Sequence, residues 1–131
     1  MNILNSRMRT PDGTILESKH RHDYVTHMDA NGKEYMLDGG LDYVRCSAHG
    51  EEEMLTIYTD HPHELIRAAV KWGTYGPEGN QTLTYIKISE MSSDHLRKCV
   101  FAKGMMIRAS IKQAMRNELE YRDALKNLPT D

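Results

Sequence analysis

Residues 24–37 read YVTHMDANGKEYML and decide the fold expected for the first half of the chain. The runs 24–27 and 34–37 flank the pair Asn31-Gly32. Such a pair between two apolar runs is a strong short-range signal for a hairpin, because both residues tolerate a positive φ. We therefore predict an antiparallel β-hairpin over this stretch.

Similar signals extend the pattern in both directions. Pro11-Asp12-Gly13 predicts a turn between the runs 3–8 and 14–17, since Pro presets φ for one turn position and Gly supplies φ > 0 for another. Gly39-Gly40 breaks the chain before the run 41–44. The runs 54–58 and 83–88 then alternate between apolar and polar residues, as half-buried strands do.

A first helix is expected between these last two strands. Asp60 caps it and Pro62 lies in its first turn. It ends near Trp72-Gly73, where Gly adopts the left-handed geometry that closes many helices.

Two further helices are expected after the strands. Ser92 or Ser93 caps the second, and Gly104 interrupts the chain after it. The third and longest runs from about 105 to 125, with apolar residues on its buried side.

A length of 131 residues fits one domain, and the pattern of elements predicts an α+β fold. We expect an N-terminal antiparallel sheet with helices gathered at the C-terminal end. The single domain 1–131 would be mainly β with one helix over 1–91 and a helical pair over 92–127. No apolar run reaches the ~18 residues of a membrane helix, no secretory signal is visible, and two cysteines make no disulfide framework. The expected location is the cytoplasm.

Basic residues gather near the C-terminus. Residues 1–94 hold 9 basic and 15 acidic side chains, whereas 95–131 hold 8 basic and 4 acidic ones. Within 95–117, Arg108, Lys112 and Arg116 recur at every fourth position, which places them on one helical stripe. Since guanidinium groups clamp phosphate oxygens, the stripe predicts a pyrophosphate or phosphodiester site. The alternative is a surface stripe or an interface that pairs with the acidic N-terminal region. The protein as a whole is not basic enough for a duplex-DNA binder.

The segment 72–81, WGTYGPEGNQ, is the most distinctive loop in the sequence. Its glycines let backbone amides approach a ligand closely, and the rings of Trp72 and Tyr75 are able to stack on a base. We place Trp72, Tyr75 and His95 beside the basic stripe as candidate ligand-binding residues. The alternative is a rigid connection in which Trp72 fills the core.

Seven histidines raise the question of a metal site. The pairs His20 and His22, next to Asp23, and His61 and His63 put two imidazoles on one strand face, and Cys46-x-x-His49 adds a further pair. None of these spacings is that of a structural zinc site. We predict no metal ligand, no cofactor and no catalytic residue.

Four strings carry a resemblance to a known family. They are KHRHDYVTH at 19–27, YMLDGGLDY at 35–43, WGTYG at 72–76 and ELEYR at 118–122. In these strings the chain resembles a family of small phage and prophage proteins, the first type of Thoeris anti-defence sponge, and the resemblance covers about residues 7 to 122.

The resemblance implies a protein that sequesters glyco-cyclic ADP-ribose, the signal of a bacterial TIR-domain defence enzyme, without cleaving it. It further implies dimers and higher oligomers in the cytoplasm of the infected host, with the signal held near the C-terminal helices, and a separate pocket for cyclic oligonucleotides. Two other classes stay open on the residues alone. One is a metal-dependent nucleotide hydrolase that uses His20, His22 and Asp23, and the other is an inhibitor that binds only a host protein.

Overall fold

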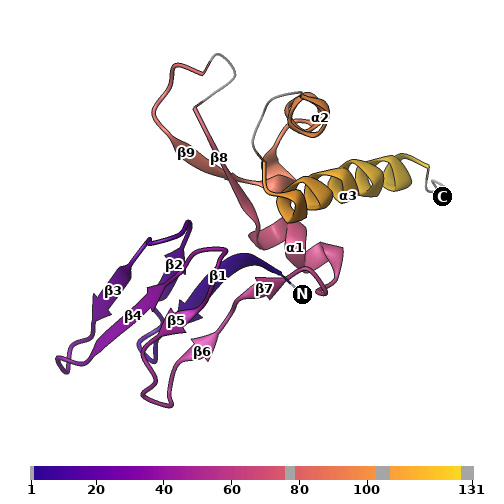
Figure 1. Cartoon of the computed structure of the whole chain (residues 1–131). Coiled ribbons are helices and arrows are strands. Elements are labelled where there is room, and N and C mark those ends of the chain that lie inside the picture. The colour runs from indigo at the N-terminus through magenta and orange to yellow at the C-terminus, as the bar shows by residue number, and fades with distance from the viewer. Residues whose placement is uncertain (1, 76–78, 103–106, 128–131) are drawn as a thin grey trace. The chain divides into compact units, whose positions relative to one another are not determined.

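The computed structural model describes residues 2–75, 79–102 and 107–127. Backbone contacts divide the chain into two compact units, Met1–Asp60 and His61–Asp131, and each is described here by itself (Figure 1). Among these described residues, the first unit consists of antiparallel strands and the second of three α-helices, a short 3₁₀ helix and a β-ribbon, so the α+β class predicted from the sequence is confirmed. The predicted organisation as one domain stays a prediction.

The first unit contains two small antiparallel sheets. In one, β1 pairs with β2, β6 and β7, and in the other β4 pairs with β3 and β5. The strands are β1 (Ile3–Arg9), β2 (Ile15–Ser18), β3 (Val25–Met28), β4 (Glu34–Asp38), β5 (Arg45–Cys46), β6 (Glu53–Met54) and β7 (Ile57–Tyr58). Met8, Leu16, Tyr35 and Leu37 form the core of this unit.

Both predicted hairpins are confirmed. Strands β1 and β2 pair across the turn at Pro11-Asp12-Gly13, where Gly13 has φ +90°. Strands β3 and β4 pair across 29–33, where the Asp29 carboxylate accepts hydrogen bonds from the amides of Asn31 and Lys33. Gly32 supplies the positive φ of 79° that the turn needs.

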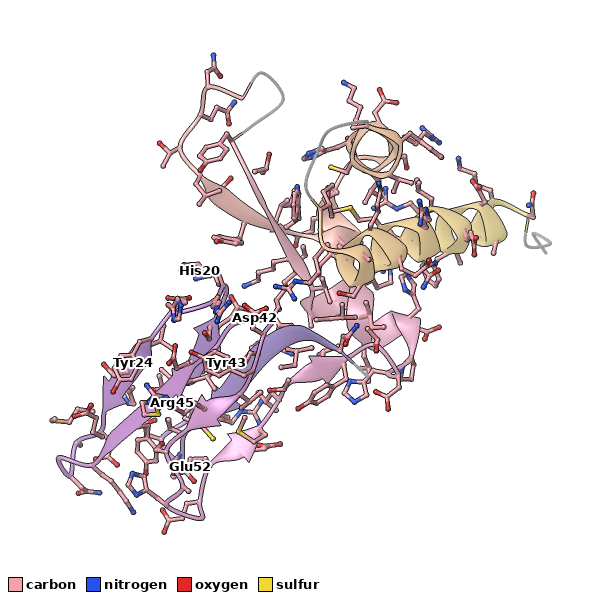
Figure 2. All side chains as sticks on the ribbon, viewed as in Figure 1. His20, Tyr24, Asp42, Tyr43, Arg45 and Glu52 are labelled. Atoms are coloured by element: carbon pink, nitrogen blue, oxygen red, sulfur yellow. The ribbon has the colours of Figure 1, made fainter. Side chains whose placement is uncertain are left out.

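The later strands of this unit differ from the prediction. The run 41–44 is a turn rather than a strand, and 54–58 splits into β6 and β7. In this turn the Asp42 amide donates to the Gly39 carbonyl at 3.0 Å, and the Gly40 backbone comes so close to His20 that a Cβ on Gly40 would lie 2.2 Å from the His20 carbonyl carbon. His20, in the turn at 19–23, and Asp42 lie at the same end of this unit (Figure 2).

The second unit is built around a helix pair and a two-stranded ribbon. Its elements are α1 (His63–Ala69), β8 (Lys71–Thr74), β9 (Thr84–Lys87), the short 3₁₀ helix η1 (Ile88–Glu90), α2 (Ser93–Phe101) and α3 (Ala109–Lys126). Strands β8 and β9 pair antiparallel, and α2 packs against α3. Val70, Ile88, Leu96, Ile111 and Met115 are among its most buried apolar side chains.

The predicted bounds of two helices are wrong. Helix α1 begins after Pro62, without a side-chain cap from Asp60, and ends at Ala69. Trp72-Gly73 does not close it, because these residues pair with β9 as part of a strand. Helix α3 begins at Ala109 because the backbone of Arg108 is extended, with ψ 133°. The Ser92 cap of α2 is confirmed, and Gly104 lies outside the described residues.

A buried ion network joins the helices of the second unit. Glu118 of α3 is fully buried and accepts hydrogen bonds from Arg67, Arg122 and His63 at 2.8–2.9 Å. Burial by itself would raise the pKa of Glu118, but these hydrogen bonds outweigh it and lower the pKa from 4.5 to about 2. Tyr121 extends the network, since the Arg67 guanidinium lies 4.6 Å from the centre of its ring.

Candidate functional site

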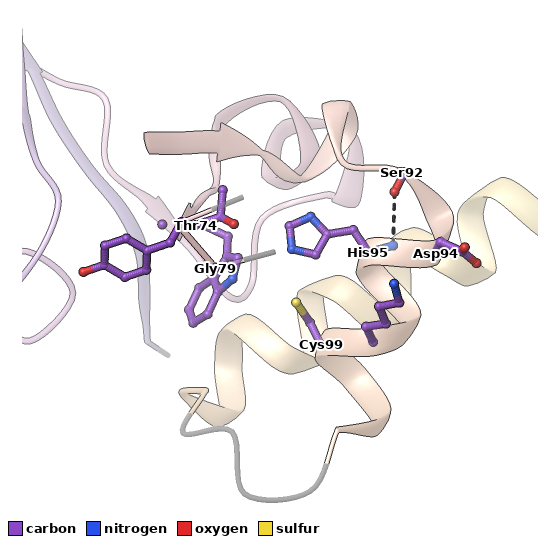
Figure 3. Close-up of a pocket in the computed structure, with 10 residues that line it drawn as sticks. Thr74, Gly79, Ser92, Asp94, His95 and Cys99 are labelled. Carbon is purple, nitrogen blue, oxygen red and sulfur yellow. Dashed lines mark hydrogen bonds between the residues drawn. The ribbon is translucent and has the colours of Figure 1, made fainter. Parts of the chain in front are cut away.

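The second unit contains a cavity of about 600 Å³ between the β8–β9 ribbon and α2 (Figure 3). This volume is within the range of small-molecule sites. The cavity has two walls. The described residues of the ribbon wall are Trp72, Gly73, Thr74, Tyr75 and Gly79, and those of the helix wall are Ser92, Asp94, His95, Lys98 and Cys99.

The ribbon wall carries the aromatic side chains. Trp72 is half-buried and pairs with Ile86, while Tyr75 is 55% exposed just beyond the end of β8. Gly73 lies between them, where a Cβ would come within 3.2 Å of the Tyr85 ring. Any larger residue there would have to displace that ring, so a glycine suits this position.

The helix wall carries the polar side chains. The Ser92 hydroxyl accepts a hydrogen bond from the His95 amide at 3.1 Å, which fixes the first turn of α2. His95, Lys98 and Cys99 then share one face at i, i+3 and i+4. Figure 3 shows the His95 ring directed toward the ribbon, with the Cys99 thiol beside it.

Cys99 forms an apolar part of this wall. Its side chain is buried, and burial raises the pKa of the thiol above its ordinary value. The thiol therefore stays protonated near neutral pH and is a weak nucleophile. Asp94, by contrast, is exposed, and its carboxylate Oδ1 lies 3.6 Å from the guanidinium Nη1 of Arg97.

The lining residues suit a ligand with an aromatic ring and a limited negative charge. Rings of Trp and Tyr stack on nucleobases, and each stacked base contributes about 1–3 kcal/mol to binding. Lys98 supplies one cation for a phosphate group, whereas Asp94 supplies a carboxylate that is able to accept from hydroxyl groups. The cavity is therefore suited to a nucleotide better than to a bare polyanion.

The structure brings together three of the six residues predicted to bind ligand: Trp72, Tyr75 and His95. Sequence reasoning did not single out Asp94, Lys98 and Cys99. The helical spacing from His95 could have found Lys98 and Cys99, because residues three and four positions on share its face.

The other three predicted residues are elsewhere. Arg108, Lys112 and Arg116 are not among the described residues that line the cavity. Lys112 and Arg116 lie within α3 as predicted, whereas Arg108 is its N-cap residue, whose carbonyl accepts from the Lys112 amide at 3.0 Å. Whether an anion binds to this stripe stays a prediction.

The histidine-rich segment 19–23 forms a structured turn. The Asp23 carboxylate accepts from the Lys19 amide at 2.8 Å, and its carbonyl accepts from the buried Ser18 hydroxyl at 2.7 Å. The same hydroxyl accepts from the Gly40 amide, which ties this turn to Gly39-Gly40. Within the part of the chain that the structure describes, no group of three or more His, Cys, Asp or Glu is placed to hold a metal ion.

Comparison of the chain with protein-family models, curated proteins and solved structures gave no match. Among the described residues, no helix combines the length and the apolar character that crossing a bilayer requires.

Proposed function

We propose that this chain binds a nucleotide signal of the cyclic ADP-ribose class in the cavity between β8–β9 and α2, and sequesters it without cleavage. The observation that carries the proposal is the arrangement of Trp72 and Tyr75 on one wall opposite His95 and Lys98 on the other. The resemblance of four sequence strings to the Thoeris anti-defence sponges supports glyco-cyclic ADP-ribose as the ligand. On this proposal the protein acts in the cytoplasm of an infected bacterium.

The contacts that the cavity offers are those of a binding site. A base would stack on the Trp72 ring, a phosphate would meet the Lys98 ammonium, and the buried Cys99 thiol would pack against the ligand. Sequestration requires that the ligand stay bound long enough to keep it from an effector. A nanomolar dissociation constant, about −12 kcal/mol, calls for contacts on more than one side of the ligand.

Native mass spectrometry with glyco-cyclic ADP-ribose tests the proposal. We expect a mass increase of one or more intact ligands per protomer, and the same ligand recovered unchanged after denaturation. Linear ADP-ribose is the matched control, since it carries the same base and phosphates without the ring closure, and cyclic oligonucleotides test the second ligand class. Recovery of a cleaved product would favour the hydrolase, and no binding of any nucleotide would favour a protein-only inhibitor.

Lys98→Gln is expected to weaken binding of glyco-cyclic ADP-ribose about five-fold, because a hydrogen bond at a partly exposed site contributes about 1 kcal/mol. Arg116→Gln provides the comparison, since Arg116 is exposed on α3 outside the cavity. Isothermal titration calorimetry measures both. A larger loss in Arg116→Gln than in Lys98→Gln would move the site to the basic stripe of α3.

A homo-oligomer is expected in solution. Ile111 and Met115 of α3 are buried within the chain itself, whereas Phe101 is 73% and Leu65 52% exposed. Two separate exposed apolar side chains are ordinary at the surface of a monomer, so the expectation rests on the resemblance to the anti-defence sponges. Light scattering at micromolar concentration should give a mass at least twice 15.1 kDa, and a monomer mass would contradict this prediction.

A further inference from the structure

The Glu118–Arg122 pair is hydrogen-bonded to the segments that precede the two walls of the cavity. The two residues are one turn apart on α3 and are joined by a hydrogen bond of 2.8 Å. Neither lines the cavity. Their other partners, however, belong to the segments that lead directly into its two walls.

Glu118 holds the segment that leads to the ribbon wall. Its carboxylate accepts two hydrogen bonds from the Arg67 guanidinium, at 2.8 and 2.9 Å, and one from His63. Both donors are on α1, and the chain passes from the end of α1 at Ala69 into β8 through Val70 alone. The position of Trp72 therefore follows from that of α1.

Arg122 holds the segment that leads to the helix wall. Its guanidinium donates to the carbonyl oxygens of Met91 and Ile88, at 2.7 and 3.2 Å, and to the Ser93 hydroxyl at 3.0 Å. Met91 and Ser93 flank the cap residue Ser92, and the wall residues Asp94, His95 and Lys98 follow on the same helix. The guanidinium presents five N–H donors in a fixed planar fork, whereas an ammonium group has only three donors on a single nitrogen.

The two segments also meet at the base of the ribbon. The Ile88 amide donates to the Val70 carbonyl at 3.0 Å, so the start of β8 and the end of β9 are joined there. Arg122 binds the Ile88 carbonyl on the other side of the same residue. The ion network thus fixes the ribbon base, α1 and the first turn of α2 to one point on α3.

We propose that Arg122, oriented by Glu118, is a positioning residue that sets the separation of the two walls of the cavity. The expected effect on ligand binding rests on the proposed function. The placement of the first turn of α2 does not, because it can be measured in the ligand-free protein. Arg122 touches no ligand on this account, and it acts through Met91, Ser93 and the helix that follows.

Arg122→Lys tests the proposal, with Ser93→Ala as the milder variant. Lys keeps the positive charge beside Glu118 but loses the bonds to the Met91 carbonyl and the Ser93 hydroxyl. We expect faster hydrogen exchange at the amides of 93–97 in the ligand-free protein, with the amides of α3 unchanged. We further expect glyco-cyclic ADP-ribose to bind about ten-fold more weakly, because the ligand would no longer contact both walls at once. Ser93→Ala should show the same pattern with a smaller effect.

Lys126→Arg is the control, because it alters an exposed basic residue of the same helix. The positioning role would be overturned by either of two results for Arg122→Lys. One is a hydrogen-exchange rate at 93–97 equal to that of the control variant, and the other is an equal rise in exchange rate throughout α1, α2 and α3. The outcomes separate the two proposals. If the wild-type protein binds no glyco-cyclic ADP-ribose, the proposed function fails, and the exchange data still decide whether Arg122 positions α2.

Discussion

Glu118→Gln is expected to lower the free energy of unfolding of the 61–131 unit by about 3–5 kcal/mol, the cost of breaking a buried ion pair by removal of one partner. The substitution preserves the size of the buried side chain but leaves the partly buried Arg67 and Arg122 without their shared counter-ion. Since a domain is stable by only about 5–15 kcal/mol, this loss is a large fraction of the total. Urea unfolding followed by Trp72 fluorescence measures it, because Trp72 is the single tryptophan of the chain and lies in this unit.

Glu120→Gln is the matched control, since it removes the same charge from an exposed position on the same helix. It should change the free energy of unfolding by no more than about 0.5 kcal/mol. A loss in Glu118→Gln as small as that in the control would contradict the role of the ion network.

Acid should remove the same stabilisation in the wild-type protein. The pKa of Glu118 is about 2 in the folded chain and has an ordinary value of 4.5 when unfolded. A lowered pKa contributes stability that is complete above pH 4.5 and is lost as the pH falls toward 2. The stability difference between wild type and Glu118→Gln should therefore shrink over this range, and a constant difference would contradict the assignment.

Trp72→Ala is expected to weaken binding of glyco-cyclic ADP-ribose between about ten- and one-hundred-fold, because the base loses its stacking partner. Trp72→Phe retains an aromatic face and should recover most of the affinity. Calorimetry measures both variants, with the unfolding transition as a check that the ribbon stays folded. Equal affinity in Trp72→Ala and wild type would show that the base does not bind against this wall.

Local turn chemistry made the first unit predictable. The hairpins at Pro11–Gly13 and Asn31-Gly32 follow from residues that tolerate a positive φ, and the structure has both. The turn at 41–44 was not predictable in the same way. It includes a close approach of the Gly40 backbone to His20 and a hydrogen bond from the Gly40 amide to the Ser18 hydroxyl, and both join segments about 20 positions apart.

Tertiary pairing explains one difference in the second unit. Trp72-Gly73 has the composition of a helix end, but its pairing with Tyr85 and Ile86 makes it a strand. These two partners are 12 and 14 positions away, so a local pattern does not reveal the pairing.

The aromatic and imidazole residues of the candidate site could be predicted from the sequence. The buried ion network around Glu118, which supports the site, could not. Trp72, Tyr75 and His95 are unusual enough in composition or type to be selected from the sequence alone. Glu118 is a charged residue that a hydrophobicity pattern assigns to solvent. Its burial depends on Arg67 and His63, which are 51 and 55 positions away, so no local pattern could have revealed it.

The fluorescence of Trp72 during titration with glyco-cyclic ADP-ribose tests the central claim most directly, because this residue is the single tryptophan and lines the cavity. The account predicts a saturable change in emission at nanomolar to low micromolar ligand, with a stoichiometry that agrees with calorimetry and a weaker response to linear ADP-ribose. Binding detected by calorimetry with unchanged Trp72 emission would place the ligand elsewhere, and no binding by either method would contradict the claim itself.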